Sequence, residues 1–409
     1  MNRGFYIILA AQFFSALADN ALLFAAIALL ASLEAPAWQT PVLQQFFVFA
    51  YIVLAPFVGP FADGLPKGRV MLISNTVKLA GCAAMLFGLH PLYAYGIVGI
   101  GAAMYSPAKY GILTEYLPHD RLVLANGWME GLTVAAIILG AILGGLMLAP
   151  GFGGAVFGGG TMTALGTLLD DGAKAAVLAI LGIYLLAAIV NLYIPRVAID
   201  HKLPRRSPVY ILQDFSHSFR LLWRDPLGQV SLAVTTLFWG AGATLRLIVL
   251  VWAGAVLHFG LERATQLTAV VAVGIAFGSL LAAKWVSLQG AVKVLPVGIA
   301  MGFAVMGMAL IDDWRLAVLM LIVIGAMGGY FVVPMNALLQ HRGHLLMGAG
   351  HSIAVQNFNE NLSILVMLGA YALMIRAELS IQTIIVLFGL FVAVVMYFIY
   401  RKHRYDEVI

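Results

Sequence analysis

Long apolar segments recur along the whole chain and are separated by short polar turns. A helix needs about 20 apolar residues to cross the hydrocarbon core of a bilayer, and windows of that length predict about 12 membrane-spanning helices. The predicted spans lie near residues 5–32, 41–62, 69–88, 91–115, 122–148, 173–194, 227–257, 264–287, 291–310, 314–340, 346–375 and 380–400. The pattern therefore predicts an all-α integral membrane protein.

Composition narrows the class of protein further. Of 409 residues, 62% are hydrophobic and only 10% are charged, whereas soluble domains carry about 25% charged residues. This balance excludes a soluble enzyme, a disordered tail protein and a nucleic-acid binder. The single cysteine, Cys82, excludes an intramolecular disulfide and a cysteine-based metal site. We expect no cofactor, no metal and no nucleic-acid partner.

The basic residues orient the predicted spans. Most of the 23 Lys and Arg residues fall at the two termini and in the even-numbered loops. Because Lys and Arg accumulate in cytoplasmic loops, both termini are predicted to be cytoplasmic. The first apolar run is too long for the core of a cleaved signal peptide and contains Asp19, so we interpret it as a retained span.

The longest basic loop, residues 195–226, divides the spans into six and six. A weak internal repeat supports two related halves, because residues 101–107 in the fourth span and 325–334 in the tenth share Gly, Ala, Met, Tyr and a final Pro. We predict six-helix bundles at 1–194 and 227–409 that are joined by a cytoplasmic linker at 195–226. This arrangement resembles the major facilitator architecture, in which substrates bind between the halves.

Two connecting segments have distinctive patterns. In the linker, Ile211, Phe215, Phe219 and Leu222 recur at helical spacing, which predicts an amphipathic helix that either lies in the headgroup layer or packs under the bundles. The Gly-rich segment 149–172 lacks the ending of a phosphate-binding loop. It is interpreted as an outer loop.

Charges inside the predicted spans require a physical reason, because each costs several kcal/mol unless it is paired or hydrated. The charged residues within the spans are Asp19, Lys78, Lys109, Glu130, Arg246 and Glu360. All except Lys78 fall on spans expected to face the central cavity of the architecture that the chain resembles. On several of these spans, polar residues one helical turn from the charge form a narrow polar stripe on an otherwise apolar helix. Such stripes indicate the walls of a hydrated path.

Each intramembrane charge has two interpretations. Asp19 and Arg246 either bind substrate or form a static ion pair. Glu360 either lines the substrate path with Gln356 and Asn357 or belongs to a structural polar network with Asn357, Asn359 and Asn361. Lys109 and Glu130 either pair with each other, close a gate or contact substrate. The candidate substrate-binding residues are therefore Asp19, Arg246, Glu360, Gln356, Asn357, Lys109 and Glu130. Lys78 is predicted to extend its ammonium group to the membrane interface.

The loop after the second span carries Asp63 and, after a glycine, Arg69. It resembles the loop motif of the major facilitator superfamily, with two additional residues between the acidic residue and that glycine. The resemblance implies a charged latch at the cytoplasmic end of the bundle. The alternative is a solvated turn.

Several stretches resemble one family, the bacterial lysophospholipid transporters of the LplT type. They are residues 11–24, 105–113, 237–246, 332–340 and 354–361. The resemblance implies import of lysophospholipids, mainly lysophosphatidylethanolamine, across the inner membrane of a Gram-negative bacterium without an obligatory ion gradient. It also implies a separate cytoplasmic acyltransferase/acyl-carrier-protein synthetase that re-acylates the lipid, and membrane lipids as partners.

This substrate suits the buried charges. Arg246 is expected to bind the phosphate, since a guanidinium can donate two hydrogen bonds to it, and Asp19 is expected to bind the ammonium. A rival interpretation is a proton-coupled exporter of amphipathic small molecules, in which Asp19, Glu130 and Glu360 accept protons. A membrane-embedded enzyme is disfavoured, because His258 and Glu262 lie in an outer loop without a nucleophile motif.

Overall fold

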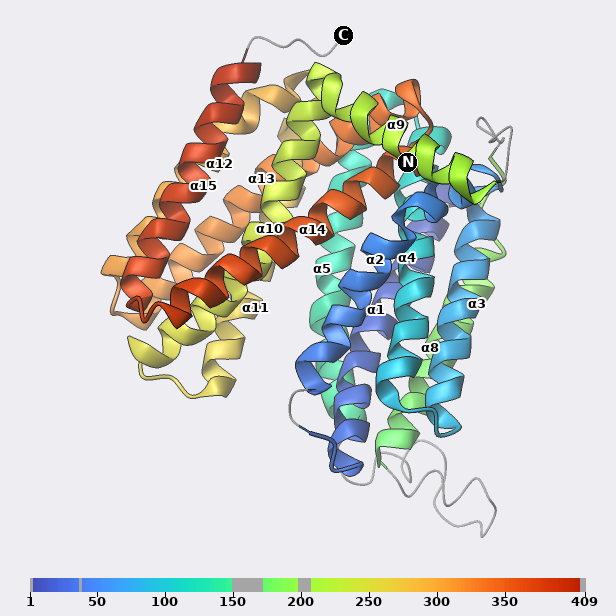
Figure 1. The fold of residues 1–409 in the computed structure, drawn as a ribbon, viewed down its shortest axis with the longest axis horizontal. Helices are drawn as coiled ribbons and strands as arrows, with labels where there is room; N and C mark the ends of the chain where they lie inside the picture. Colours follow the sequence, from blue (N-terminus) through green and yellow to red (C-terminus); the bar gives the residue numbers. More distant parts are fainter. Residues whose placement is uncertain (1–2, 37–38, 149–171, 198–206, 405–409) are drawn as a thin grey trace. The chain divides into compact units, whose positions relative to one another are not determined.

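The computed structural model describes residues 3–36, 39–148, 172–197 and 207–404, and within them the chain forms helices and no strands (Figure 1). In chain order the elements are α1 (Arg3–Ser32), α2 (Gln39–Asp63), α3 (Lys67–Leu86), α4 (Pro91–Tyr116), η1 (His119–Arg121), α5 (Leu122–Met147), α8 (Gly172–Asn191), α9 (Pro208–Arg224), α10 (Pro226–Ala255), α11 (Leu261–Trp285), η2 (Leu288–Val294), α12 (Leu295–Gly307), η3 (Met308–Leu310), α13 (Trp314–Leu346), α14 (Ala349–Arg376) and α15 (Ile381–His403). Each predicted span corresponds to a helix or, near 291–310, to α12 with its flanking turns η2 and η3. The all-α prediction is confirmed.

In the part of the chain that the structure describes, 11 helices are long and apolar enough to cross a membrane. Among the predicted spans, α4 falls outside this set. It has 26 residues, which at 1.5 Å per residue give a length of about 39 Å, enough to cross a hydrocarbon core of about 30 Å. Its hydropathy is reduced by Ser106, Pro107 and Lys109 together with several Gly and Tyr residues. The chain is a multi-pass membrane protein.

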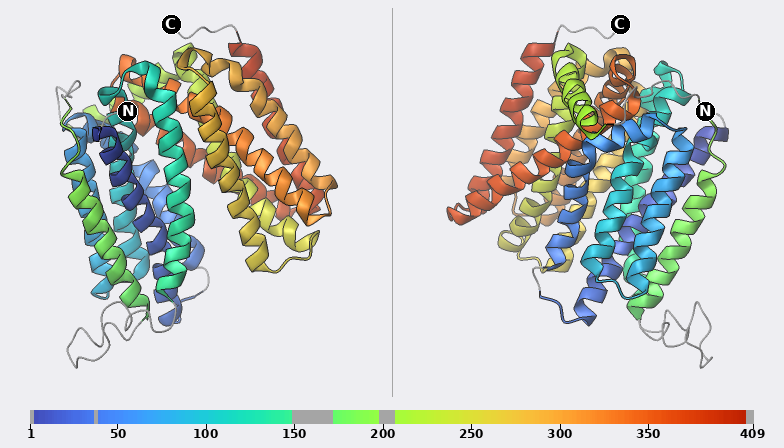
Figure 2. Two further views of the ribbon diagram at one scale, coloured as in Figure 1. Left: turned by 180° about the vertical axis from the view of Figure 1, so that it is seen from behind. Right: turned by 45° about the vertical axis from the view of Figure 1, so that its right-hand side comes forward.

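The Cα positions form two compact units. The first contains Met1–Ile112 with Ala135–Ile211, and the second contains Leu113–Val134 with Leu212–Ile409. In the first unit α8 packs along α1 and α3 (Figure 1). In the second, α12 lies beside α15 and α11 lies beside α13 (Figure 2). The end of α4 and the first half of α5 group with the second unit, whereas the division drawn from the sequence keeps both in the first.

Helices α11 and α13 meet through facing glycines, which we call the glycine seam. Gly274 and Gly278 lie four residues apart in α11, as do Gly325 and Gly329 in α13, the spacing that lets membrane helices approach closely. A Cβ added at Gly278 would lie 1.9 Å from the carbonyl oxygen of Ala326. The two backbones are therefore in direct contact, and the seam has no room for a side chain.

The amphipathic helix predicted in the linker is α9. Phe215 and Phe219 of α9 stack edge-on against Phe358 of α14, with ring centroids 5.6 and 6.3 Å apart, and Leu222 is fully buried. The apolar side of α9 thus packs on α14, and its place in the headgroup layer or under the two bundles stays a prediction. The predicted outer loop 149–172 lies outside the described residues except for its last position.

Candidate functional site

Polar side chains of α1, α3 and α8 meet inside the first unit. Lys78 Nζ donates hydrogen bonds to Asp19 Oδ2 at 2.6 Å and to Ser15 Oγ at 2.9 Å. The hydroxyl of Tyr184 donates to Asp19 Oδ1 at 2.7 Å, and Ser15 donates to Asn75 Oδ1 at 2.7 Å. We call these five residues the Asp19 cluster. Helices α1 and α3 each contribute two side chains one turn apart and so present polar faces to each other, whereas α8 contributes Tyr184 alone.

The side chain of Lys78 is 2% exposed, whereas that of Asp19 is 19% exposed. The prediction that Lys78 extends to the interface is therefore wrong. Its ammonium group also lies 4.8 Å from the ring centroid of Tyr105, and a buried ammonium is stable only when a counterion compensates its lost hydration. An ion pair was one of the two interpretations of Asp19. Binding of substrate by the exposed part of this carboxylate stays a prediction.

A second polar cluster lies in the second unit, where α5, α13 and α14 each contribute a pair of side chains four residues apart. We call it the amide ladder. Asn126 and Gln340 exchange two hydrogen bonds at 2.9 and 2.8 Å. Gln356 Nε2 donates to Asn336 Oδ1 at 2.9 Å and to Glu360 Oε1 at 2.7 Å. The Asn336 amide in turn lies 3.4 Å from Glu130 Oε1 as a weak donor. The six members are Asn126, Glu130, Asn336, Gln340, Gln356 and Glu360.

Every member of the amide ladder is at least nine-tenths buried. Amides can donate and accept at the same time, so Asn336 and Gln356 connect two buried carboxylates through hydrogen bonds. Buried polar groups of this kind must be satisfied, because an unpaired one costs about 1–3 kcal/mol. Glu360 thus belongs to a buried polar network, in which it is joined to Gln356 and through it to Asn336. Whether Glu360 and Gln356 also line a substrate path stays a prediction.

Arg246 differs from the other intramembrane charges. It lies within α10 and is exposed, on the same face as Gly242 one turn earlier. Among the described residues its guanidinium has no hydrogen-bond or ion-pair partner. Placing an arginine at the centre of a membrane helix costs about 3 kcal/mol on insertion scales. The side chain therefore needs water or an anion.

The remaining predicted residues are placed as follows. Lys109, in the first unit, is buried, and its Nζ lies 4.4 Å from the ring centroid of Tyr110. Asn357 is buried in α14, and its backbone carbonyl accepts a hydrogen bond from Asn361. Their contact with substrate stays a prediction.

In the loop motif, Asp63 pairs with Lys67 at 2.6 Å, and both side chains are buried. Lys67 also donates to the carbonyl of Ala62 at 2.8 Å and so caps the last turn of α2. Arg69 is exposed. Lys67 is thus the partner of Asp63 that the sequence reasoning missed. The latch role of Asp63 and Arg69 stays a prediction.

Sequence reasoning also missed Tyr184 and Asn75. A signal for α3 was present, because Ser74, Asn75 and Lys78 form a polar stripe on an otherwise apolar span. Tyr184 had no such signal, since it stands alone in an apolar helix. Within the described ranges, no group of three or more His, Cys, Asp or Glu side chains is arranged to hold a metal ion.

Comparison with known families agrees with this architecture. The profile of the Major Facilitator Superfamily matches residues 8–366. The crystal structure of the E. coli fucose:proton symporter FucP aligns with a TM-score of 0.76 at 14% identity, covering 97% of this chain and 98% of that one. A bacterial homologue of the iron transporter ferroportin in an outward-facing state aligns with a TM-score of 0.72 at 15% identity, covering 98% and 100%. The helices and the matched profile together define a member of the major facilitator superfamily.

Two curated relatives narrow the family. The proteins named lysophospholipid transporter LplT from Yersinia pestis (strain Pestoides F) and Yersinia pseudotuberculosis serotype I (strain IP32953) are each 45% identical over 378 residues, 92% of this chain and 88% of the relative. Within the superfamily, the chain belongs to the LplT family. The resemblance seen in the sequence is confirmed.

Proposed function

We propose that this protein moves lysophospholipids, with lysophosphatidylethanolamine as the main substrate, to the cytoplasmic leaflet of the bacterial inner membrane. The observation that carries the proposal is Arg246, an exposed guanidinium within a membrane helix and without a protein partner among the described residues. A phosphate diester meets its need for an anion. The names of the curated relatives support the same substrate class.

The two charges of the headgroup are assigned to two residues. Arg246 binds the phosphate through paired N–H donors. Asp19 binds the ammonium, and the hydrogen bonds from Lys78 and Tyr184 orient its carboxylate. A carboxylate offers about four lone-pair sites, so the exposed part of Asp19 has acceptor capacity beyond these two bonds.

The proposed cycle is alternating access, with both termini in the cytoplasm. The lipid is released to a separate acyltransferase/acyl-carrier-protein synthetase, which restores the second acyl chain. Because the acyl tail starts and ends in a bilayer, its transfer yields little net free energy, and headgroup contacts decide selectivity between lipids with different headgroups.

The test is flipping of labelled lysophosphatidylethanolamine in liposomes that contain the purified protein, with diacyl phosphatidylethanolamine as the comparison lipid. Wild type should flip the lysolipid faster than the diacyl lipid. Arg246→Ala should slow flipping by about tenfold or more, because the phosphate loses a desolvated charge-assisted contact.

The matched control for Arg246→Ala is Arg315→Ala, which removes an exposed arginine at the start of α13. Both variants should keep the elution profile and melting temperature of wild type. Undiminished flipping in folded Arg246→Ala would overturn the assignment of the phosphate contact.

A second candidate function is proton-coupled export of amphipathic small molecules. It is favoured by the amide ladder, which links the buried carboxylates of Glu130 and Glu360. A proton uncoupler separates the two functions. Flipping of lysolipid that persists with uncoupler supports the first, and export of an amphipathic drug that stops with uncoupler supports the second.

A further inference from the structure

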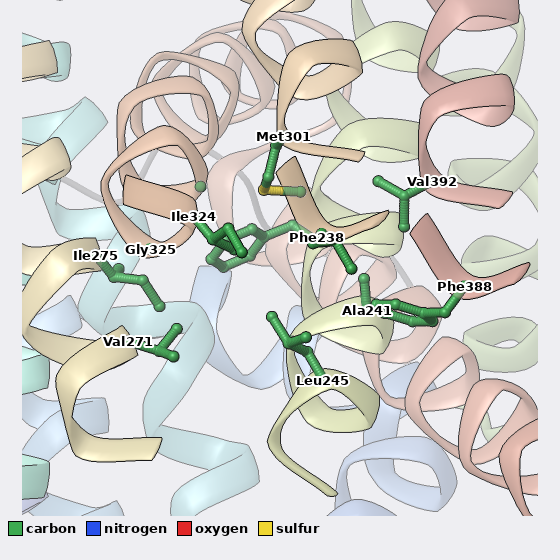
Figure 3. Close-up of a pocket in the computed structure, with 13 residues that line it drawn as sticks. Phe238, Ala241, Leu245, Val271, Ile275, Met301, Ile324, Gly325, Phe388 and Val392 are labelled. Carbon is green, nitrogen blue, oxygen red and sulfur yellow. The ribbon is translucent and has the colours of Figure 1, made fainter. Parts of the chain in front are cut away.

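The second unit contains an apolar cavity of about 50 Å³ between α10, α11, α12, α13 and α15 (Figure 3). Its walls carry only apolar side chains and glycines, among them Phe238, Leu245, Met301 and Phe388. None of the candidate polar residues of the site lines it. The interior is therefore suited to hydrocarbon and offers water almost no hydrogen-bond partner.

One wall residue of the cavity, Gly242, lies on the face of α10 that carries Arg246. Gly242 lines the cavity and is also exposed, and a Cβ placed there would meet no atom within 4 Å. Arg246 lies four residues further along the same helix face, a rise of about 6 Å. Gly242 thus lies both in the wall of the apolar cavity and on the helix face that carries the exposed Arg246.

We propose that this cavity binds the end of the acyl chain of a lysophospholipid whose phosphate is held by Arg246. The inference rests on the proposed function and extends it by assigning the tail a site of its own. A ligand with one anionic group and one hydrocarbon chain matches the combination of a guanidinium and an apolar pocket on one helix. A ligand without the anion would leave Arg246 without a partner.

The size of the cavity limits what enters it. A single water needs a cavity of about 10–15 Å³, and a methylene or methyl group is of similar size. A cavity of 50 Å³ therefore holds on the order of four methylene or methyl groups. The remainder of a long chain must lie outside the cavity, along the face of α10. Because the cavity holds only a few carbons of the chain, it should distinguish lysolipids by chain length and leave the headgroup preference unchanged.

The experiment uses one variant that fills the cavity and one that enlarges it. Ala241 and Leu245 both line the cavity and are 5% and 8% exposed. Ala241→Leu adds three carbon atoms, close to the capacity of the space, and Leu245→Ala removes three. The matched control is Ala243→Leu, which makes the same change on α10 at a position that does not line the cavity. Melting temperature and elution profile establish that each variant is folded.

Flipping is measured for lysophosphatidylethanolamines with 12, 14, 16 and 18 carbons. Ala241→Leu should slow the longest chains by about fivefold or more relative to the shortest, since apolar pockets discriminate single methylenes by factors of this order. Leu245→Ala should shift the preference toward longer chains, and Ala243→Leu should match wild type. Arg246→Ala should slow all lengths alike.

Equal effects of Ala241→Leu on every chain length would overturn the proposal. So would a chain-length profile that follows the host bilayer and not the cargo, because a membrane lipid would then be the occupant. If wild type flips no lysolipid at all, the proposed function fails. The cavity is still tested in that case by the affinity of purified protein for 12- and 18-carbon lysolipids, which should differ in wild type and converge in Ala241→Leu.

Discussion

At the scale of single residues, the Asp19 cluster shows how a membrane helix accommodates a lysine whose side chain is buried inside the protein. Lys78 is surrounded by α1, α3 and α4 and is compensated by one carboxylate and one hydroxyl. Removing one partner of a buried ion pair strands the other charge, whereas removing both leaves ordinary apolar packing. The pair therefore contributes less to stability than the loss of either member alone would suggest.

Variants of this pair test that view. Asp19→Asn should lower stability by about 3 kcal/mol, because it leaves the buried Lys78 ammonium uncompensated. The double variant Asp19→Asn/Lys78→Met should recover much of this loss, as measured by thermal unfolding in detergent.

The same double variant separates structure from transport. If Asp19 binds the ammonium of the substrate, the double variant folds but flips lysolipid poorly. A double variant whose loss of stability equals the sum of the single losses would contradict the coupling between the two residues.

Residue patterns identified which charges lie inside the membrane, but not their partners. Helical spacing relates residues on one helix, such as Ser15 with Asp19 or Gln356 with Glu360. It does not say which helix lies opposite. The Lys78 interpretation failed for this reason, since a lysine stem can reach either the interface or a carboxylate on a neighbouring helix. Arg246, by contrast, is exposed and has no partner on another helix within the described ranges. The pattern of α10 alone was therefore enough to select it as a candidate site residue.

At the scale of secondary-structure elements, the glycine seam joins α11 and α13 by backbone contact. Membrane helices gain little from apolar burial against each other, so close packing and direct contact hold them together. Gly278 and Gly325 leave no space for a Cβ, which would approach the carbonyl oxygens of Ala326 and Val271 to 1.9 and 2.2 Å.

Gly278→Leu should therefore separate the two helices and reduce stability by about 1–3 kcal/mol or more. The control is Gly369→Leu on α14, where a Cβ would meet no atom within 4 Å. Size-exclusion profiles after graded heating measure the difference. A Gly278→Leu protein as heat-stable as the control would show that the contact is not needed.

At the scale of the whole molecule, the carboxylate of Asp225 makes stability depend on pH. It caps α10 by accepting from the Gly228 N–H at 2.8 Å and accepts two hydrogen bonds from Arg342 of α13. Burial alone would raise the pKa of Asp225, but the hydrogen bonds from Arg342 and Gly228 outweigh it, so the pKa is lowered. Since the pKa is lower in the folded state, this carboxylate stabilises the fold above its unfolded pKa of about 3.9 and loses that effect as the pH falls further.

This pH dependence can be measured by comparing the melting temperatures of wild type and Asp225→Asn at pH 7 and at pH 3. Asp225→Asn should melt below wild type at neutral pH, and the gap should narrow as the pH falls below about 4, when wild type also loses the charge. A gap that is constant over this range would exclude ionisation of Asp225 as the cause.

Much of the architecture could be predicted because the bilayer fixes it. A constant hydrocarbon thickness sets the length of each span, and the absence of water inside it makes helices obligatory. The ends of the helices were less certain. α13 continues to Leu346, beyond the predicted 340, because the residues after Gln340 are polar and hydropathy does not register them. The amide ladder and the apolar cavity depend on which helices adjoin, and no single-helix pattern contains that information.

The glycine seam also constrains how the second unit can change shape. The backbones of α11 and α13 touch at Gly278 and the carbonyl of Ala326, with no side chains between them. The two helices therefore cannot slide past each other without steric collision. Helices α11 and α13 must then move together as one rigid body during a transport cycle. Bending or tilting that admits cargo falls to their neighbours, and a crosslink placed across the seam should leave turnover intact.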